Sequence, residues 1–184
     1  MKFVHIADMH FDSPFTGLNV VDNLGDIRRL EQREVFRKII DYIQKNAIDY
    51  LLIAGDLYEQ QYIRKSTIEF INNQFETIKN TKIFIAPGNH DPYVKNSYYD
   101  SFQWSQNVHI CKHELERIEE PEVDIYVTAF TNFFQNESPI EKMEIKNANK
   151  CNLLLTHCDL NGRKDQNRFC LSSNIRISIE CFSV

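Results

Sequence analysis

The stretch Tyr-Leu-Leu-Ile-Ala-Gly-Asp at residues 50–56 is an unbroken apolar run that is closed by a glycine and an aspartate. Such a run is typical of a parallel β-strand buried on both faces. Similar runs lie at 3–7 and 82–86, and segments with the apolar spacing of amphipathic helices lie between them, at 30–47 and at about 67–78. The alternation of strand and helix predicts an α/β fold.

Length and composition set the frame for the whole chain. Its 184 residues, 42% of them hydrophobic and 26% charged, predict a single soluble domain over residues 1–184. No run approaches the ~18 apolar residues of a membrane helix, and the first residues lack the apolar run of a signal peptide. Five cysteines without a Cys-x-x-Cys pair fit reduced thiols. We therefore expect a cytoplasmic protein with no membrane association.

Metal-binding side chains follow the apolar runs at the points where the runs end. Because open α/β sheets place their sites at the carboxyl ends of strands, we expect these side chains to meet. Carboxylate, imidazole and amide oxygen suit manganese, iron or zinc, and one carboxylate can bridge two metals. Two metals about 3.5–4 Å apart can clamp a phosphate ester and activate a water. The residues concerned are Asp8 and His10, Asp56, Asn89 with His90 and Asp91, and His157.

Each of these elements also has an ordinary structural explanation. Asp-x-His at the end of a strand arises by chance, and Gly55-Asp56 and Pro87-Gly88-Asn89 are common turn sequences. His157 alone is more often a hydrogen-bonded polar residue than a ligand. Asp8 and His10 point to one side only if the extended conformation persists beyond the first run. Four such segments, each at the end of an apolar run, together predict a metal site.

These residues carry a resemblance to a known family. Asp-Met-His at 8–10, Gly-Asp-Leu-Tyr at 55–58, Pro-Gly-Asn-His-Asp-Pro at 87–92 and Thr-His at 156–157 resemble the ordered motifs of the calcineurin-like metallophosphoesterases, over residues 1–160. The flanking sequences HIADMHFDSPF and GNHDPY resemble the nuclease subunits of SbcD-type and YhaO-type DNA-repair exonucleases. The resemblance implies a β-sandwich of mixed sheets flanked by helices, and an enzyme that hydrolyses phosphodiester bonds by metal-activated water.

The resemblance also implies a role for each residue. Asp8, His10 and Asp56 would hold one divalent metal, and Asp56, Asn89 and His157 a second, with manganese expected and iron or zinc as alternatives. His90 would stabilise the developing charge or protonate the leaving group, and Asp91 would orient the His90 ring. DNA ends are the implied substrate. A coiled-coil ATPase and a second copy of the chain are the implied partners.

One departure from the family concerns the end of the sequence. The Gly-x-His segment that completes both metal sites is absent, because residues 158–184 contain no histidine. We therefore expect a domain that is incomplete at its C-terminus, with each metal one imidazole short and manganese weakly bound.

Two functional alternatives remain open at this stage. The same metal core serves general phosphatases and nucleotide phosphodiesterases, and the missing histidines allow a non-catalytic fragment or binding subunit. The net charge of −5 argues against overall electrostatic binding of nucleic acid. The basic residues of 28–38 alternate with acids and predict a solvated helix face. The aromatic residues of 93–104 could stack on bases, although their spacing favours packing in the core.

Overall fold

A four-stranded parallel sheet forms the centre of the molecule. In the computed structural model, which describes residues 1–14, 24–135 and 139–158, this sheet has the order β1-β2-β3-β4. Its strands are β1 (Phe3–Ile6), β2 (Tyr50–Ala54), β3 (Lys82–Ala86) and β4 (Val108–Ile110), and all neighbours pair in parallel. The carboxyl ends of the strands therefore lie along one edge, as the sequence pattern predicts.

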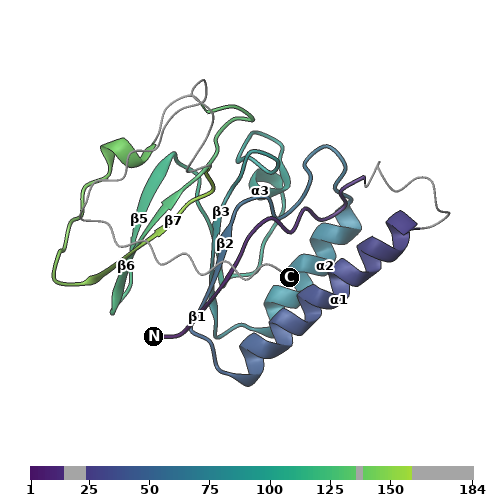
Figure 1. Cartoon of the computed structure of the whole chain (residues 1–184), viewed down its shortest axis with the longest axis horizontal. Helices are drawn as coiled ribbons and strands as arrows, with labels where there is room; N and C mark the ends of the chain where they lie inside the picture. Colours follow the sequence, from purple (N-terminus) through teal and green to yellow (C-terminus); the bar gives the residue numbers. More distant parts are fainter. Residues whose placement is uncertain (15–23, 136–138, 159–184) are drawn as a thin grey trace.

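A second sheet and two long helices enclose the first sheet. The second sheet has the order β5-β6-β7, in which β5 (Leu115–Glu119) is antiparallel to β6 (Val123–Thr128) and β7 (Cys151–Leu155) is parallel to it. Figure 1 shows this sheet on one side of the parallel sheet and the helices α1 (Leu24–Lys45) and α2 (Lys65–Thr77) on the other. Two short helices, α3 (Tyr98–Ser101) and the 3-10 helix η2 (Pro139–Lys142), lie in connections. The predicted α/β fold of mixed sheets flanked by helices is confirmed.

Strand β2 contributes to two separate cores because successive side chains point to opposite faces. Leu51 and Ile53 face the helices and pack with residues such as Phe36 of α1. Leu52 and Ala54 face the second sheet and pack with apolar residues of β6 and β7. All five residues of β2 are buried, as predicted. Each large apolar side chain that is fully buried stabilises the fold by about 1.5–3 kcal/mol, so β2 stabilises the packing on both of its faces.

The aromatic residues that follow β3 belong to the core on the helix side. Tyr99 is 4% exposed, and four partly buried rings pack against the same cluster, namely Tyr93, Tyr98, Phe102 and Trp104. The prediction of core packing for these rings is confirmed. Their packing against the core gives these rings a structural role.

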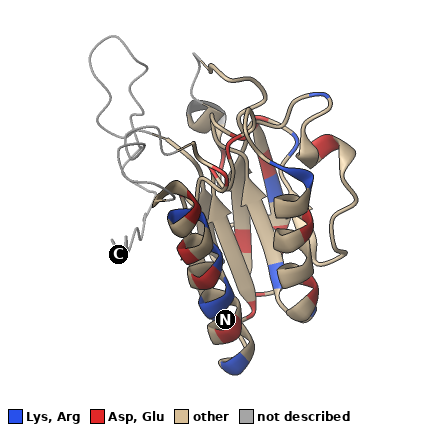
Figure 2. Ribbon diagram, turned by 90° about the vertical axis from the view of Figure 1, so that its right-hand side faces the viewer, with Lys and Arg blue, Asp and Glu red and all other residues tan. Residues whose placement is uncertain are grey.

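Three of the arginines of α1 are paired along their own helix. Arg28, Arg29 and Arg37 form ion pairs with the acidic residues Glu31, Asp26 and Glu34, each three positions away. Figure 2 shows Lys and Arg side by side with Asp and Glu on the two helices that cover the sheet. The alternation of acids and bases that the sequence predicts for this helix face is confirmed, and the three ion pairs reduce the positive charge that α1 offers to nucleic acid.

Neither long helix has the character of a membrane span. Among the helices that the structure describes, none combines the length and apolar character needed to cross a membrane. Residues 159–184, on which the expectation of an incomplete C-terminus rests, lie outside the described residues.

Candidate metal centre

The loops that follow β1, β2 and β3 are joined by backbone hydrogen bonds at the carboxyl edge of the parallel sheet. His10 N–H donates to the Asp56 carbonyl at 2.8 Å, and Phe11 N–H donates to the Leu57 carbonyl at 3.0 Å. Gln60 N–H donates to the His90 carbonyl at 3.0 Å, which adds the third loop. These bonds fix residues that are far apart in sequence before any ligand is bound.

The backbone at this edge is held in a conformation that most residues avoid. Asp8, His10 and Asp56 have φ values of 54°, 45° and 52°. A non-glycine residue in the left-handed region costs on the order of 1–3 kcal/mol and persists only where its surroundings enforce it. The extended conformation therefore does not persist through Asp8 and His10. Their proximity comes from the loop geometry, which differs from the strand-like geometry that the sequence suggested.

Two glycines allow the site residues to approach the backbone closely. Gly55 has a φ of +78°, and a Cβ at this position would collide with the ring of His157. A Cβ at Gly88 would collide with the Asp56 carboxylate and lie 2.7 Å from the Asp56 nitrogen. Both glycines belong to turn sequences, and in both positions a larger residue would collide with a residue of the site.

The carboxylate of Asp56 lies at the centre of the five predicted metal ligands. Its Oδ2 atom is 3.6 Å from His10 Nε2 and 3.3 Å from His157 Nε2. Asp8 Oδ1 lies 3.9 Å from His10 Nε2, and Asn89 Oδ1 lies 3.2 Å from His157 Nε2. The structure thus brings all five residues together around one buried carboxylate, with ligand atoms of Asp8, Asp56 and His157 within 4.8 Å of one another.

The two imidazoles are oriented through their other ring nitrogens. His157 Nδ1 lies 3.0 Å from the Ala54 carbonyl, and His10 Nδ1 lies 2.8 Å from Glu59 Oε1. A carbonyl or carboxylate acceptor at Nδ1 places a proton there, which leaves the lone pair of the neutral ring on Nε2. In both residues Nε2 is the atom that faces Asp56. Once the ring is neutral, this tautomer presents Nε2 to a metal.

The electrostatics of the site favour a positive charge beside Asp56. Burial lowers the pKa of His157, but its hydrogen bond and charge interaction with Asp56 outweigh burial and raise this pKa to about 9. Burial raises the pKa of Asp56, but the interactions with His157 and His90 together outweigh burial, so the pKa of Asp56 lies below its usual value. Since metal binding displaces protons from its ligands, a divalent cation would replace the His157 proton. The donor set and its charge fit divalent cations.

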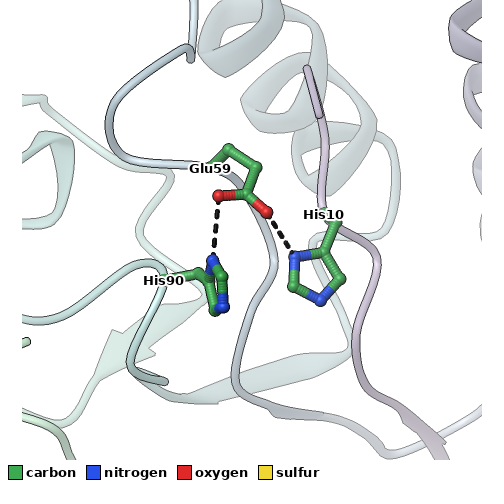
Figure 3. A group of neighbouring side chains, drawn as sticks. All are labelled: His10, Glu59 and His90. Atoms are coloured by element: carbon green, nitrogen blue, oxygen red, sulfur yellow. Dashed lines mark hydrogen bonds and ion pairs between the residues drawn. The ribbon is translucent and has the colours of Figure 1, made fainter. Parts of the chain in front are cut away.

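His90 lies beside this cluster and is held by a residue that the sequence interpretation missed. Figure 3 shows the Glu59 carboxylate between two imidazole rings: Glu59 Oε2 is 2.9 Å from His90 Nδ1, and Glu59 Oε1 is 2.8 Å from His10 Nδ1. The two rings are 5.0 Å apart in an edge-on arrangement. Burial lowers the pKa of His90, but the hydrogen bond to Glu59 and the negative charges of Asp56, Glu59 and Asp91 together outweigh burial and raise it. Glu59 therefore favours the protonated form of His90.

Asp91 has a different position from the one expected. Its carboxylate is fully buried and accepts hydrogen bonds from the backbone N–H groups of Asp56, Leu57 and Gly88, at 3.0, 2.6 and 2.7 Å, and from the Tyr99 hydroxyl at 2.7 Å. The expected orientation of the His90 ring by Asp91 is not what the structure has, because Glu59 contacts that ring. Asp91 instead ties the loop that follows β2 to the loop that follows β3.

Known proteins are similar in sequence to this chain. Residues 1–177 match the family described as calcineurin-like phosphoesterase. The "uncharacterized metallophosphoesterase YhaO" of Bacillus subtilis is 30% identical over 113 residues, which cover 60% of this chain and 27% of that protein.

Two further relatives are components of a bacterial nuclease. The SbcD component of the SbcCD nuclease from Staphylococcus epidermidis is 24% identical over 189 residues, which cover 89% of this chain and 48% of that protein. The corresponding protein of Staphylococcus saprophyticus is 22% identical over 187 residues, which cover 88% of this chain and 47% of that protein. The chain thus spans half or less of the length of these relatives.

Proposed function

We propose, because the chain belongs to the calcineurin-like phosphoesterase family, that it is a phosphodiesterase that uses two divalent cations and acts on DNA ends. Asp8, His10 and Asp56 would hold one cation, and Asp56, Asn89 and His157 the other. The observation that carries this assignment is the position of Asp56 Oδ2, at 3.6 and 3.3 Å from the Nε2 atoms of two differently placed imidazoles. A carboxylate in that position suits a bridge between two cations.

The cations supply the electrostatic part of the chemistry. When bound, they stabilise charge on the phosphoryl oxygens and lower the pKa of a bound water. The chain's own residues orient them, because Glu59 and the Ala54 carbonyl fix the tautomers of His10 and His157. Manganese is our proposal for the cation, with iron and zinc as the other candidates for a set of carboxylate, imidazole and amide ligands.

His90 is our candidate for the catalytic acid. Its Nδ1 is held by Glu59, which leaves Nε2 free to donate a proton to the departing sugar oxygen. The hydrogen bond to Glu59 helps to raise the pKa of His90, which favours the protonated form that a general acid needs. His90 is 46% exposed in its side chain, so a substrate can reach it.

The choice of DNA as substrate rests on the relatives. Two of them are named as one component of the SbcCD nuclease, and the resemblance of residues 5–15 and 88–93 points to the same class. Because these relatives are named as parts of a larger nuclease, we also propose a partner protein, the coiled-coil ATPase of this nuclease class, together with a second copy of the chain.

An assay on linear DNA separates this proposal from its alternatives. We expect manganese-dependent release of nucleotides from end-labelled DNA, and no release by Asp56→Asn. Hydrolysis of bis-p-nitrophenyl phosphate without any degradation of DNA would favour a general phosphatase or nucleotide phosphodiesterase. A folded chain that retains no manganese and hydrolyses neither substrate would favour a non-catalytic binding subunit.

A further inference from the structure

We propose that Phe133 and Phe134 form a platform on which the base of an unpaired terminal nucleotide stacks beside His90. The inference rests on the proposed function, because it gives the substrate of that site a specific form: a DNA end whose last base is free of its pair. Neither phenylalanine belongs to the motifs that predicted the metal centre.

The exposure of the two rings is the first observation. Phe134 is 83% exposed and Phe133 is 38% exposed, whereas the aromatic residues of 93–104 pack against the core. The ring of Phe134 contributes little to the fold by burial, whereas Phe133 is partly buried and presents the rest of its surface. Two adjacent rings of this kind next to a candidate active site therefore offer apolar surface to a ligand.

The segment that carries the rings is anchored to the site at Phe130. Phe130, just after β6, donates its N–H to the Pro87 carbonyl at 3.0 Å and accepts from Tyr93 N–H at 2.8 Å. These bonds flank the loop that carries Asn89 and His90. The Phe130 ring also meets the His157 ring edge-on at 6.0 Å. The chain is thus attached to the metal centre three residues before Phe133.

The rings and the candidate acid line the same pocket. Its volume is about 340 Å³, and its walls include Phe133 and Phe134 together with Glu59, Asn89 and His90. This size lies in the ~300–1,000 Å³ range of small-molecule sites. A base that stacks on the rings would place its sugar-phosphate near His90. The pocket therefore joins an apolar wall to the acid and to one proposed metal ligand.

Stacking also addresses the weak electrostatic attraction of this chain for DNA. The net charge is −5, and the arginines of α1 named above are paired with acids on their own helix. A protein without a basic stripe gains little from phosphate contacts, and base stacking on aromatic rings is the other large contribution to binding of single strands. Stacking requires an exposed base face, which an intact pair inside a duplex does not offer.

The test compares two single-stranded oligonucleotides that differ only in their terminal nucleotide, which is either adenosine or an abasic analogue. Binding is measured by fluorescence anisotropy in the presence of calcium, with oligonucleotides that carry the fluorescent label at one end or at the other. A gel checks that the oligonucleotides keep their length during the measurement. We expect the protein to prefer the adenosine end by about 5- to 150-fold. Phe134→Ala should reduce this preference to about one, and Phe134→Trp should retain it. Tyr42→Ala removes an exposed ring on α1, 56% exposed, and should behave as wild type.

Several outcomes would overturn the inference. They are no preference in the wild-type protein, a preference that survives in Phe134→Ala, an equal loss of affinity for both oligonucleotides in that variant, and no binding of either oligonucleotide. The readout does not depend on hydrolysis. A protein that shows the preference and never cuts DNA contradicts the proposed function alone, and a protein that cuts DNA without the preference contradicts this inference alone.

Discussion

Replacement of Asp91 tests whether this residue fixes the loops of the metal centre. Its carboxylate accepts three backbone N–H groups and one hydroxyl while fully buried. Asp91→Ala leaves these donors without their acceptor. A buried group that stays unsatisfied costs roughly 1–3 kcal/mol, so the three N–H groups give about 3–9 kcal/mol. Two effects reduce this sum. Water can enter the space that the side chain leaves. The variant also no longer has the cost of burying a charged carboxylate, a cost that raises the pKa of Asp91 to about 6 in the wild-type protein.

We therefore expect Asp91→Ala to lower the free energy of unfolding by about 3–5 kcal/mol, which is a large part of a typical total of about 5–15 kcal/mol. Asp91→Asn should cost less. The asparagine oxygen can still accept from the N–H groups of Asp56 and Gly88. The Tyr99 hydroxyl can rotate to accept a hydrogen bond from the asparagine NH2 group, so only the Leu57 N–H faces a donor where it had an acceptor. We expect a loss of about 1–3 kcal/mol for this variant.

Urea unfolding at pH 7.5, followed by circular dichroism, measures both losses. In a thermal unfolding experiment, at about 2–4 °C for each kcal/mol in a chain of this size, the melting temperature of Asp91→Ala should fall by about 6–20 °C. Asp41→Asn, an exposed carboxylate on α1, is the control and should stay within about 0.5 kcal/mol of wild type. Equal stability of Asp91→Ala and the control, or a larger loss for Asn than for Ala, would show that the hydrogen bonds of Asp91 do not hold the loops.

Four further substitutions test the site and the second sheet. His90→Ala should leave manganese content by elemental analysis nearly unchanged and reduce hydrolysis by about 10²–10⁴-fold; loss of metal would contradict its role as acid. Asp56→Asn should empty both metal sites, because a neutral amide cannot bridge two cations, and two retained metals per chain would refute the bridge. Glu59→Gln should weaken manganese binding by about 10–100-fold in calorimetry, because Glu59 fixes the His10 tautomer; unchanged affinity would mean that His10 needs no such support. The pKa of Asp124 lies below its usual value because Lys150 and Arg117 hydrogen-bond to it. The ionised carboxylate therefore stabilises the fold at pH values above the ordinary aspartate pKa, and this stabilisation is lost as the pH falls from there through the lowered pKa of Asp124. Asp124→Asn should reduce the decrease in the free energy of unfolding that is measured as the pH is lowered, and an unchanged decrease would assign the pH dependence to other groups.

The sequence predicted the central sheet more accurately than the second one. The expected bounds of β2 and β3 agree with the structure, because strands buried on both faces leave unbroken apolar runs. Strand β5 was missed. Its sequence, Leu-Glu-Arg-Ile-Glu, spaces the two apolar residues three apart, which does not match the alternation of a strand. It forms because β6 beside it is fully buried and offers an antiparallel partner.

The site shows the same division between local pattern and long-range contact. Asp8, Asp56 and Asn89 could be predicted because each follows an apolar run, and parallel strands bring those ends to one edge. Glu59 does not follow a run. Its position depends on the backbone pairing of Phe11 with Tyr58, and on its own N–H, which donates to the Phe11 carbonyl at 3.1 Å. No local pattern encodes that pairing. The one available signal was chemical: a carboxylate three residues after the predicted bridging Asp56 must lie close to it in a tight loop. Asp91 was assigned the wrong partner because it is adjacent to His90 in the sequence. In the structure the Asp91 carboxylate is buried and turned toward the backbone N–H groups, while Glu59 contacts the His90 ring.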